Sequence, residues 1–289
     1  MGELVDRLKQ HLVGRWLITY FIDSPGPHYA PAIAFTAFVA IFPIVLGIES
    51  LILLTNPKTG LAGRVGHVFL EAFPVGTRTE VAGVLGTVIR HPGTVGLLSL
   101  VAMLWAGSAM FACLGAALNA MHGTHGRNLL HQRVMGIRLI FVLLVALVIV
   151  VTAENLTGGL PLAFVTGPVL AGLVLVMLLG FIYRIAPNIR RSPRDVLPGA
   201  VIAAVLIEVA TYSFPLYTRV TSEIDTYGKG VALALILLFW LWLCSHIILL
   251  GAHFNDTRWD IRAERVAAAE GVDGAAAAGA ADGGAELTA

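Results

Sequence analysis

Charged residues are scarce in this chain. Asp, Glu, Lys and Arg together make up 13% of its 289 residues, whereas soluble domains carry about 25%. Hydrophobic residues make up 57%, and the mean hydropathy is +0.83. So little charge does not suffice to cover the surface of a soluble protein. The composition therefore excludes an ordinary soluble domain and predicts a protein that lies in a lipid bilayer.

Cysteine is nearly absent, and so are the common catalytic loops. The two cysteines, Cys113 and Cys244, both fall in apolar runs, which excludes a disulfide framework and a metal site built from paired cysteines. The sequence contains no G-x-x-x-x-G-K phosphate loop and no G-x-S-x-G nucleophile motif. The net charge of +1 gives no bulk attraction to nucleic acid. We predict no enzymatic activity, no cofactor and no nucleic-acid partner.

Long apolar runs are abundant instead. Six of them reach the roughly 20 residues that cross about 30 Å of hydrocarbon, at about 30–54, 94–120, 137–156, 164–185, 196–217 and 231–254. We therefore predict an all-α fold, a polytopic bundle whose six transmembrane helices occupy residues 30–257. A cytoplasmic amphipathic helix precedes it within residues 1–29, and a cytoplasmic tail follows at 258–289. No cleavable signal peptide precedes the first run, so that run is expected to insert uncleaved.

The N-terminal segment has the periodicity of an amphipathic helix. Leu4, Leu8, Leu12 and Trp16 recur at helical spacing, with charges on the remaining face. Such a helix either lies in the cytoplasmic interface, with Trp16 and Tyr20 at headgroup level, or packs on another part of the protein. The sequence leaves both arrangements open.

Three further segments carry local signals. The long first loop, 55–93, predicts two short amphipathic helices, and the loop at 157–161 predicts a tight hairpin. After about Val266 the tail is rich in Ala, Gly, Asp and Glu and has no aromatic residue. That is the composition of a largely disordered extension.

The basic residues predict the orientation. Lys and Arg accumulate in the N-terminal segment, the second loop, the fourth loop and the tail, while the third loop has none. Because cytoplasmic loops carry the excess of Lys and Arg, both termini are expected in the cytoplasm. In the fourth loop, Arg184, Arg190, Arg191 and Arg194 border one span end. They serve either as topology anchors alone or also as a cluster that faces anionic headgroups.

Glu208 lies near the middle of the fifth apolar run, where an acidic residue costs about 2.5 to 3.5 kcal/mol. The small residues Ala200 and Ala204 share its helical face, which predicts that this face points into the bundle. A similar stripe of small residues begins at Ser108 in the second run. We therefore expect the second and fifth spans to pack together.

Other polar residues accompany Glu208. Tyr212 follows it by one helical turn, and His246 and His253 share one face of the sixth run. We predict that these four residues form an intramembrane polar centre, with Glu208 and His246 as partners. Such a pair could carry a proton, bind a cation or hold a polar headgroup. Alternatively, a neutral Glu208 that is hydrogen-bonded to a neighbouring helix braces the bundle.

Two other groups of ionisable residues are given no catalytic role. Glu49 lies toward the outer end of the first run, where we expect it to reach water. His122, His125 and His131 crowd the second loop, but no carboxylate accompanies them there and arginines intervene. That donor set does not favour a metal centre, so none is predicted.

Several segments together resemble one known family. The most specific is a P-N-x-x-x-x-x-x-D-V-x-P-G-A stretch at 187–200, followed by Glu208. Further segments match the family in the same order along the chain, at 34–43, 116–119, 217, 227–228 and 249–252. Over roughly residues 10–260 the chain resembles the YihY/BrkB family of bacterial inner-membrane proteins, long mislabelled ribonuclease BN.

The resemblance implies six spans with cytoplasmic termini in the bacterial plasma membrane. It also implies a link to serum resistance and to envelope lipid export, with the nuclease label an error. The chain departs from the family at His253, where the family usually has an acidic residue after Gly-Ala.

Three functions follow from these observations. The leading hypothesis is a plasma-membrane protein that assists the export or flipping of an envelope lipid or other amphiphile, with membrane lipids and a second copy of the chain as candidate partners. The alternative is a structural or scaffolding membrane protein without transport activity. The third is the inherited ribonuclease label. A metal nuclease gathers carboxylates and histidines in water, whereas the predicted inner loops offer chiefly Arg and His, with Asp195 alone.

Overall fold

The protein contains helices and no strand over the residues that the structure, a computed structural model, describes. These residues are 12–55, 94–124, 126, 128–157, 163–189, 191–221 and 229–285, with the isolated positions 63, 66, 70, 82, 83, 85 and 86. After the short helix α2 (Leu12–Ile22) come α3 (Gly26–Thr55), α6 (Thr94–Met121), α7 (Leu129–Thr157), α8 (Ala163–Ile185), α9 (Pro193–Thr221) and α10 (Lys229–Ala285). Six of these helices are long and apolar enough to cross a membrane. The predicted all-α fold with six candidate spans is confirmed.

Some predictions fall on residues outside this description. The two short helices predicted for 55–93 lie almost wholly there, although the isolated described positions in that stretch are helical. The hairpin predicted at 157–161 lies there apart from Thr157, the last residue of α7. The first part of the predicted amphipathic helix, residues 1–11, lies there as well.

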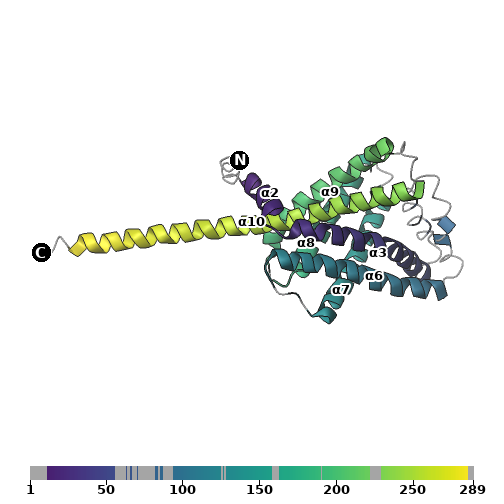
Figure 1. Cartoon of the computed structure of the whole chain (residues 1–289), viewed down its shortest axis with the longest axis horizontal. Coiled ribbons are helices and arrows are strands. Elements are labelled where there is room, and N and C mark those ends of the chain that lie inside the picture. Colours follow the sequence, from purple (N-terminus) through teal and green to yellow (C-terminus); the bar gives the residue numbers. More distant parts are fainter. Residues whose placement is uncertain are drawn as a thin grey trace.

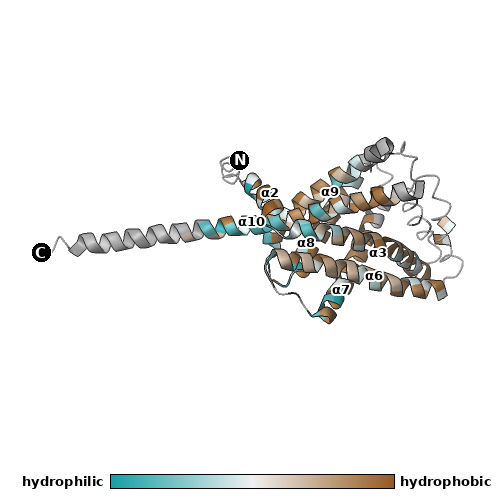
Figure 2. Cartoon of the chain, in the orientation of Figure 1, coloured by the Kyte–Doolittle hydropathy of each residue, from teal (hydrophilic) through white to brown (hydrophobic). Residues whose placement is uncertain are grey.

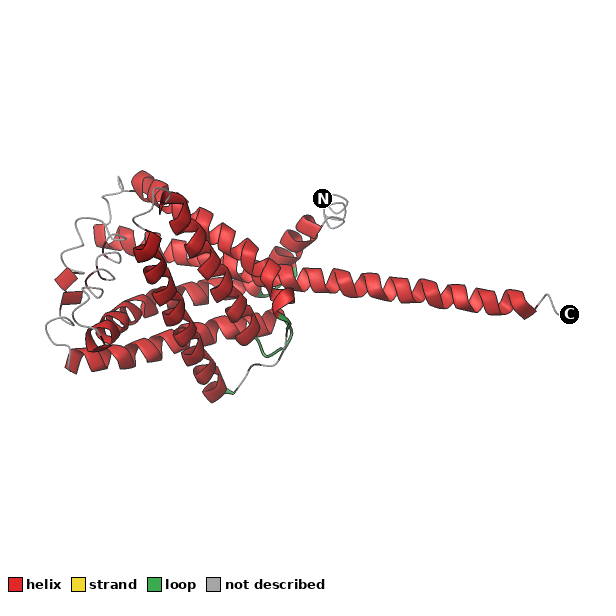
Figure 3. Cartoon of the chain, turned by 180° about the vertical axis from the view of Figure 1, so that it is seen from behind, coloured by secondary structure: helices red, strands yellow, loops and turns green. Residues whose placement is uncertain are grey.

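The six long helices pack as a closed ring. Each packs on the next along the chain, and α10 closes the ring by packing on α3. Figures 1 and 3 show this bundle from opposite sides, with α7 crossing α6 obliquely. Figure 2 shows hydrophobic residues along the spans and hydrophilic residues gathered where α2 and α10 cross. Helices that follow each other in the chain are therefore neighbours in space, as short connections favour.

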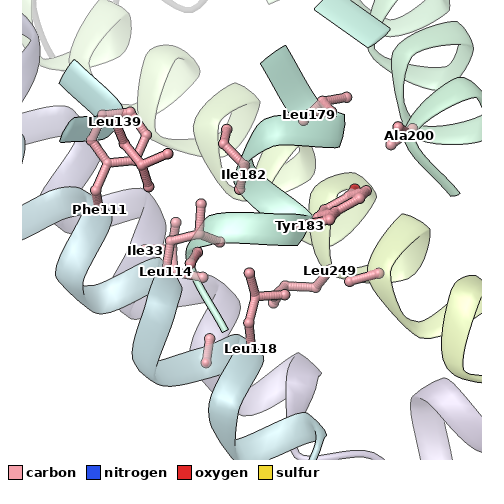
Figure 4. Close-up of a cluster of buried hydrophobic side chains, with 14 of the residues drawn as sticks. Ile33, Phe111, Leu114, Leu118, Leu139, Leu179, Ile182, Tyr183, Ala200 and Leu249 are labelled. Atoms are coloured by element: carbon pink, nitrogen blue, oxygen red, sulfur yellow. The ribbon is translucent and has the colours of Figure 1, made fainter. Parts of the chain in front are cut away.

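The buried core lies at one end of this ring. It combines the start of α3, the end of α6, the first half of α7, the end of α8, the start of α9 and the middle of α10. Figure 4 labels ten members of the cluster: Ile33, Phe111, Leu114, Leu118, Leu139, Leu179, Ile182, Tyr183, Ala200 and Leu249. We call this end the packed end. It is also the end at which α2 crosses α10 (Figure 1).

The opposite end is less tightly packed. No described residue of α7 from 141 to 150, of α8 from 167 to 178, of α9 from 205 to 213 or of α10 from 234 to 244 is buried. We call this the loosely packed end. Among the described helices, α3 and α6 bury residues there, where Gly47 meets Met103 and Gly96 lies near Ser50.

Glycine allows the close contact of α9 with α10 at the packed end. A methyl group at Gly251 would lie 2.6 Å from the carbonyl oxygen of Gly199 and 2.6 Å from the hydroxyl of Tyr183. The Tyr183 hydroxyl donates a hydrogen bond of 2.7 Å to the carbonyl oxygen of Ile248. Lipid tails are as apolar as the helices, so helix association in a membrane depends on such close packing.

The expectation that the second and fifth spans pack through their small residues is wrong. In the ring of helices α6 packs on α3 and α7, and α9 packs on α8 and α10. Gly199 and Ala203, which lie beside the predicted stripe of Ala200 and Ala204, face Gly251 of α10, and on α6 Ser108 faces Gly136 of α7. The physical reason is that Gly251 and Gly136 let a neighbouring backbone approach more closely than a side chain would. The small residues Gly199, Ala203 and Ser108 therefore pack on the next helix in the chain.

The helix α2 packs on α10, so the second of the two arrangements left open by the sequence is the one observed. Tyr20 is fully buried and Trp16 is nearly so. The indole Nε1 of Trp16 donates a hydrogen bond of 2.9 Å to the carbonyl oxygen of Leu250, and its ring meets that of Phe254 edge to face. These contacts fix α2 against the packed end.

The last helix extends well beyond the bundle. α10 continues to Ala285, and Figure 1 shows its C-terminal part projecting away from the other helices. This part includes the segment after Val266 whose composition favours disorder. Alanine favours helix, whereas each interior glycine costs about 1 kcal/mol relative to alanine. The disorder predicted there stays a prediction.

The α9–α10 contact makes a testable prediction about stability. Gly251→Ala should lower the free energy of unfolding by about 1 to 3 kcal/mol, because the new methyl group meets backbone and the Tyr183 hydroxyl. The control is Gly180→Ala, since nothing lies within 4 Å of a Cβ at Gly180, so alanine there should be neutral or stabilising by up to about 1 kcal/mol. Thermal unfolding of the purified protein in detergent checks both. Equal melting of the two variants would contradict the close contact.

Candidate functional site

A basic cavity opens at the packed end, between the start of α7 and the end of α8. Its volume is about 600 Å³, within the range of about 300 to 1,000 Å³ that is typical of ligand pockets. Eight residues line it: His131, Val134, Met135, Arg138, Arg184, Ile185, Ile189 and Arg191. Three of them are arginines and one is a histidine, while four are apolar. We call this the basic cavity.

Two of the cavity arginines are free to meet a ligand. Arg138 on α7 and Arg184 on α8 are both exposed, and no hydrogen bond or ion pair joins either to another described residue. Arg138 is two helical turns after His131, which is exposed as well. The helix spacing thus places both on the same side of α7, toward the end of α8.

Arg191 is held differently, by contacts on the α10 side. Its Nη2 donates a hydrogen bond of 2.7 Å to Oδ1 of Asp256, and its guanidinium lies 5.3 Å from the ring centroid of Trp259. Its other nitrogen, Nη1, is buried and has no hydrogen-bond partner. A guanidinium presents its N–H groups in a fixed fork, which suits carboxylate and phosphate oxygens. Arg191 therefore retains donor capacity at a wall of the cavity.

Asp256 joins the two sides of this region. The same Oδ1 that accepts from Arg191 lies 3.0 Å from Nε2 of His122, which follows α6. The side chains of His122 and Asp256 are 9% and 16% exposed, so the pair is largely shielded from water. Shielded ion pairs keep more of their attraction than exposed ones, and breaking one leaves an unpaired charge. Asp256 thus ties the end of α6 and the Arg191 segment to α10.

Two asparagines fix the backbone around these charges. Asn119 Oδ1 accepts a hydrogen bond of 2.6 Å from the backbone N–H of Asn188, which ties the segment after α8 to the end of α6. Asn255 Oδ1 accepts one of 2.8 Å from the N–H of Gly199. Asn255 Nδ2 donates one of 3.1 Å to the carbonyl oxygen of Val196. The position of Asp256, the next residue, is therefore fixed relative to the start of α9.

The arrangement suits an anion that also has an apolar part. Arg138, Arg184 and Arg191 supply positive charge and N–H donors. Val134, Met135, Ile185 and Ile189 supply apolar surface in the same cavity. Phosphate and carboxylate groups fit the first set, and an acyl or other hydrocarbon group fits the second.

The arginine cluster predicted from sequence is only partly assembled here. Arg184 and Arg191 line the basic cavity, while Arg194 is exposed at the start of α9 and does not line it. Arg190 lies outside the described residues. Sequence reasoning did not assign Arg138 and His131, which both lie in the first part of α7, to this cluster. Their basic character was visible in the sequence, but their proximity to the fourth loop depends on how α7 packs on α8.

The four residues of the predicted polar centre do not share one network. Nδ1 of His246 lies 3.0 Å from the Tyr20 hydroxyl, and Nε2 of His253 lies 2.9 Å from Oγ1 of Thr19. Both histidines thus contact α2. They lie on the same face of α10, as their seven-residue spacing predicts.

Glu208 and Tyr212 lie elsewhere. Glu208 is half-buried and faces Gly172 of α8, where a Cβ would lie 3.3 Å from its Oε1. Tyr212 is 63% exposed. No hydrogen bond or ion pair joins Glu208 to His246 among the described residues. A function shared by these residues stays a prediction.

The structure also shows the surroundings of the ionisable residues to which the sequence analysis gave no catalytic role. His122 pairs with Asp256, His131 lines the basic cavity, and His125 lies outside the described residues. Across the described part of the chain, no three His, Cys, Asp or Glu side chains gather in a way that could hold a metal ion. The expectation that Glu49 reaches water is wrong, because Glu49 is fully buried beneath Gly66.

Comparisons with known proteins point to a family of membrane proteins. The profile of the virulence factor BrkB family matches residues 17–273 of this chain. Proteins described as UPF0761 membrane protein, from Yersinia pestis (strain Pestoides F) and Yersinia pseudotuberculosis serotype O:3 (strain YPIII), are 34% identical to it over 84 residues. That stretch covers 29% of this chain and 29% of each relative, so the match spans less than a third of the relatives' length. No solved structure matches the chain.

The shared role of Asp256 predicts the effect of removing its charge. Asp256→Asn should lower the free energy of unfolding by about 1 to 3 kcal/mol, because the largely buried Arg191 loses its charged acceptor. Asp195→Asn is the matched control, since Asp195 lies 3.7 Å from an Arg262 that is 61% exposed. Its loss should cost less than about 1 kcal/mol. Thermal unfolding in detergent compares the two variants, and equal shifts would argue against a special role for Asp256.

Proposed function

We propose that this chain, which belongs to the virulence factor BrkB family, binds the anionic headgroup of an envelope lipid or similar amphiphile and assists its export or flipping. The basic cavity at the packed end of its bundle is the proposed binding site. The observation that carries the proposal is the cavity of about 600 Å³ that joins Arg138, Arg184 and Arg191 to an apolar wall.

The charge of the cavity supports an anionic headgroup. Arg138 and Arg184 have no partner among the described residues, and the buried Nη1 of Arg191 has none either. A phosphate offers several acceptor oxygens to such donors. Basic residues near a membrane surface contribute about 1 kcal/mol each toward anionic lipid. Asp256 and Trp259 already hold the Arg191 side chain in place, so this side chain loses less conformational entropy when a ligand binds.

The apolar wall supports an amphiphile rather than a free phosphate. Val134 is exposed on α7, and Leu129 and Leu130 just before it are 78% and 71% exposed. Large apolar side chains at such exposure fit contact with hydrocarbon. A ligand that places a charged group among the arginines can therefore keep its hydrocarbon part beside the start of α7.

The uneven packing of the bundle supports movement of the ligand. Helices that share no buried residues at the loosely packed end can change their separation there at little cost in lost contacts. The packed end, which carries the basic cavity, is expected to act as the fixed part. Transport folds work by such movements of one part of a bundle relative to another around a binding site.

The proposal predicts selective loss of anionic lipid binding. Arg138→Gln combined with Arg184→Gln removes about 2 kcal/mol of attraction, which corresponds to roughly a thirtyfold weaker Kd. Native mass spectrometry of the purified protein, titrated with phosphatidylglycerol and with phosphatidylcholine, measures this change. Binding of phosphatidylcholine should be unaffected, because its headgroup has no net charge.

The control is a single substitution, to be compared with Arg138→Gln and Arg184→Gln made one at a time. Arg194→Gln removes an exposed arginine of the same loop that does not line the cavity, so it should weaken binding by less than about threefold. If Arg194→Gln and each cavity arginine weaken binding equally, the attraction is general and the cavity is not the site. The same proteins in liposomes, assayed for transfer of fluorescent phosphatidylglycerol between leaflets, test the transport step. Normal folding with neither binding nor transfer would favour the scaffolding alternative.

A further inference from the structure

Glu49 of α3 is a buried carboxylic acid without a partner. Its side chain has no exposed surface, and neither Oε1 nor Oε2 has a hydrogen-bond partner. A side chain at Gly66 would overlap Oε1, and Leu85 beside Gly66 is buried as well. The carboxyl group is therefore covered at Gly66 by the loop between α3 and α6.

The hydroxyl groups at the same level of the bundle do not satisfy Glu49. Ser50 Oγ donates to the carbonyl oxygen of Leu46 at 2.7 Å, and Ser99 Oγ donates to that of Val95 at 2.8 Å. Both hydroxyls are thus turned back to their own helices. They do not donate to the carboxyl group in this conformation.

No positive charge compensates Glu49 within the helices that enclose it. α6 contains no Asp, Glu, Lys, Arg or His, and the only other ionisable side chains on α3 are His28 and Tyr29, at its opposite end. The described positions of the loop are Gly, Ala and Leu. The ionisable neighbours in that loop's sequence, among them Arg64, His67 and Glu71, lie outside the described residues.

Burial without a partner favours the neutral form of a carboxyl group, since an ionised carboxylate in an apolar, unpaired environment is far more costly than the acid. In a membrane span, such an ionisable group marks a functional site by default, and proton relays are among its best-known uses. The small residues Gly47 and Gly96 let α3 and α6 meet closely on either side of Glu49.

We propose that Glu49 is a proton-binding site, which carries its proton in the conformation described here and releases it to water when the carboxyl group becomes exposed. On release, the O–H bond of the acid breaks and the proton passes to water, leaving the carboxylate. This inference deepens the proposed function, because proton exchange at Glu49 would let a proton gradient drive the movement of the amphiphile.

A carbodiimide tests the proton directly. Dicyclohexylcarbodiimide adds to a protonated carboxyl group in apolar surroundings and rearranges to a stable N-acylurea, with no group leaving. We expect wild-type protein in liposomes at pH 7 to be labelled at Glu49 at least tenfold faster than at Glu264, a carboxylate that is 59% exposed. Peptide mass spectrometry locates the label. Labelling of Glu264 without labelling of Glu49 would overturn the proposal.

Two variants at matched reconstitution test the coupling. Glu49→Gln keeps the shape of the neutral acid, so it should fold and melt like wild type, lose the adduct, and transfer phosphatidylglycerol at a rate that no longer responds to a pH gradient. Glu264→Gln, which changes the exposed carboxylate of α10 that pairs with Arg15, should retain both the Glu49 adduct and the gradient response.

The two parts of the experiment separate the two hypotheses. If the wild type moves no lipid, the proposed function fails while the labelling still decides whether Glu49 holds a proton. If lipid moves and Glu49→Gln responds to the gradient as wild type does, the role of Glu49 in coupling is overturned although transport stands. The labelling is measured on wild-type protein, so it does not depend on the folding of any variant.

Discussion

The close contact of α9 with α10 at Gly199 and Gly251 is the constraint on which the rest of the structure depends. The two backbones touch there because neither residue has a side chain. That approach lets Asn255 bond to the backbone of α9 at Gly199 and Val196, which sets the register between the helices. Asp256 is the next residue, so the same register brings its carboxylate to Arg191 and His122. A contact between small residues in the membrane thus positions the charges at the bundle end.

The same physics explains why α7 to α10 are closely packed at one end only. Helices in lipid gain no hydrophobic free energy by associating, so they stay together where small residues permit close approach and where hydrogen bonds cross between them. Both features gather near the packed end, at Gly136, Gly199 and Gly251 and at the bonds of Asn119 and Asn255. The described ends of α7 to α10 beyond the core therefore have less to hold them together.

Much of the fold could be predicted from the sequence, but little of the site could. Run length and composition indicate the six spans because a bilayer imposes a length on each helix. The placement of α2 on α10 depended on Tyr20 and Trp16, which suit a headgroup interface as well as a protein interior, so the pattern alone left it open. The error for Glu49 has a similar origin. Its depth in α3 was visible, but the sequence pattern does not show that the loop following the span folds back over it at Gly66. Asp256 was missed because a single acid near a span end has no distinctive spacing.

The positions of the charges also bear on the direction of the proposed movement. The basic cavity, α2 and the polar part of α10 lie at the same end of the bundle. The distribution of Lys and Arg along the sequence predicts that this end faces the cytoplasm. In that orientation the cavity meets the headgroups of the inner leaflet, while Glu49 lies toward the opposite end of α3. A ligand would then be bound where the positive charge lies, and a proton would be exchanged near the other surface. That separation suits export, because protons that enter from outside first meet Glu49 while the amphiphile is first bound inside.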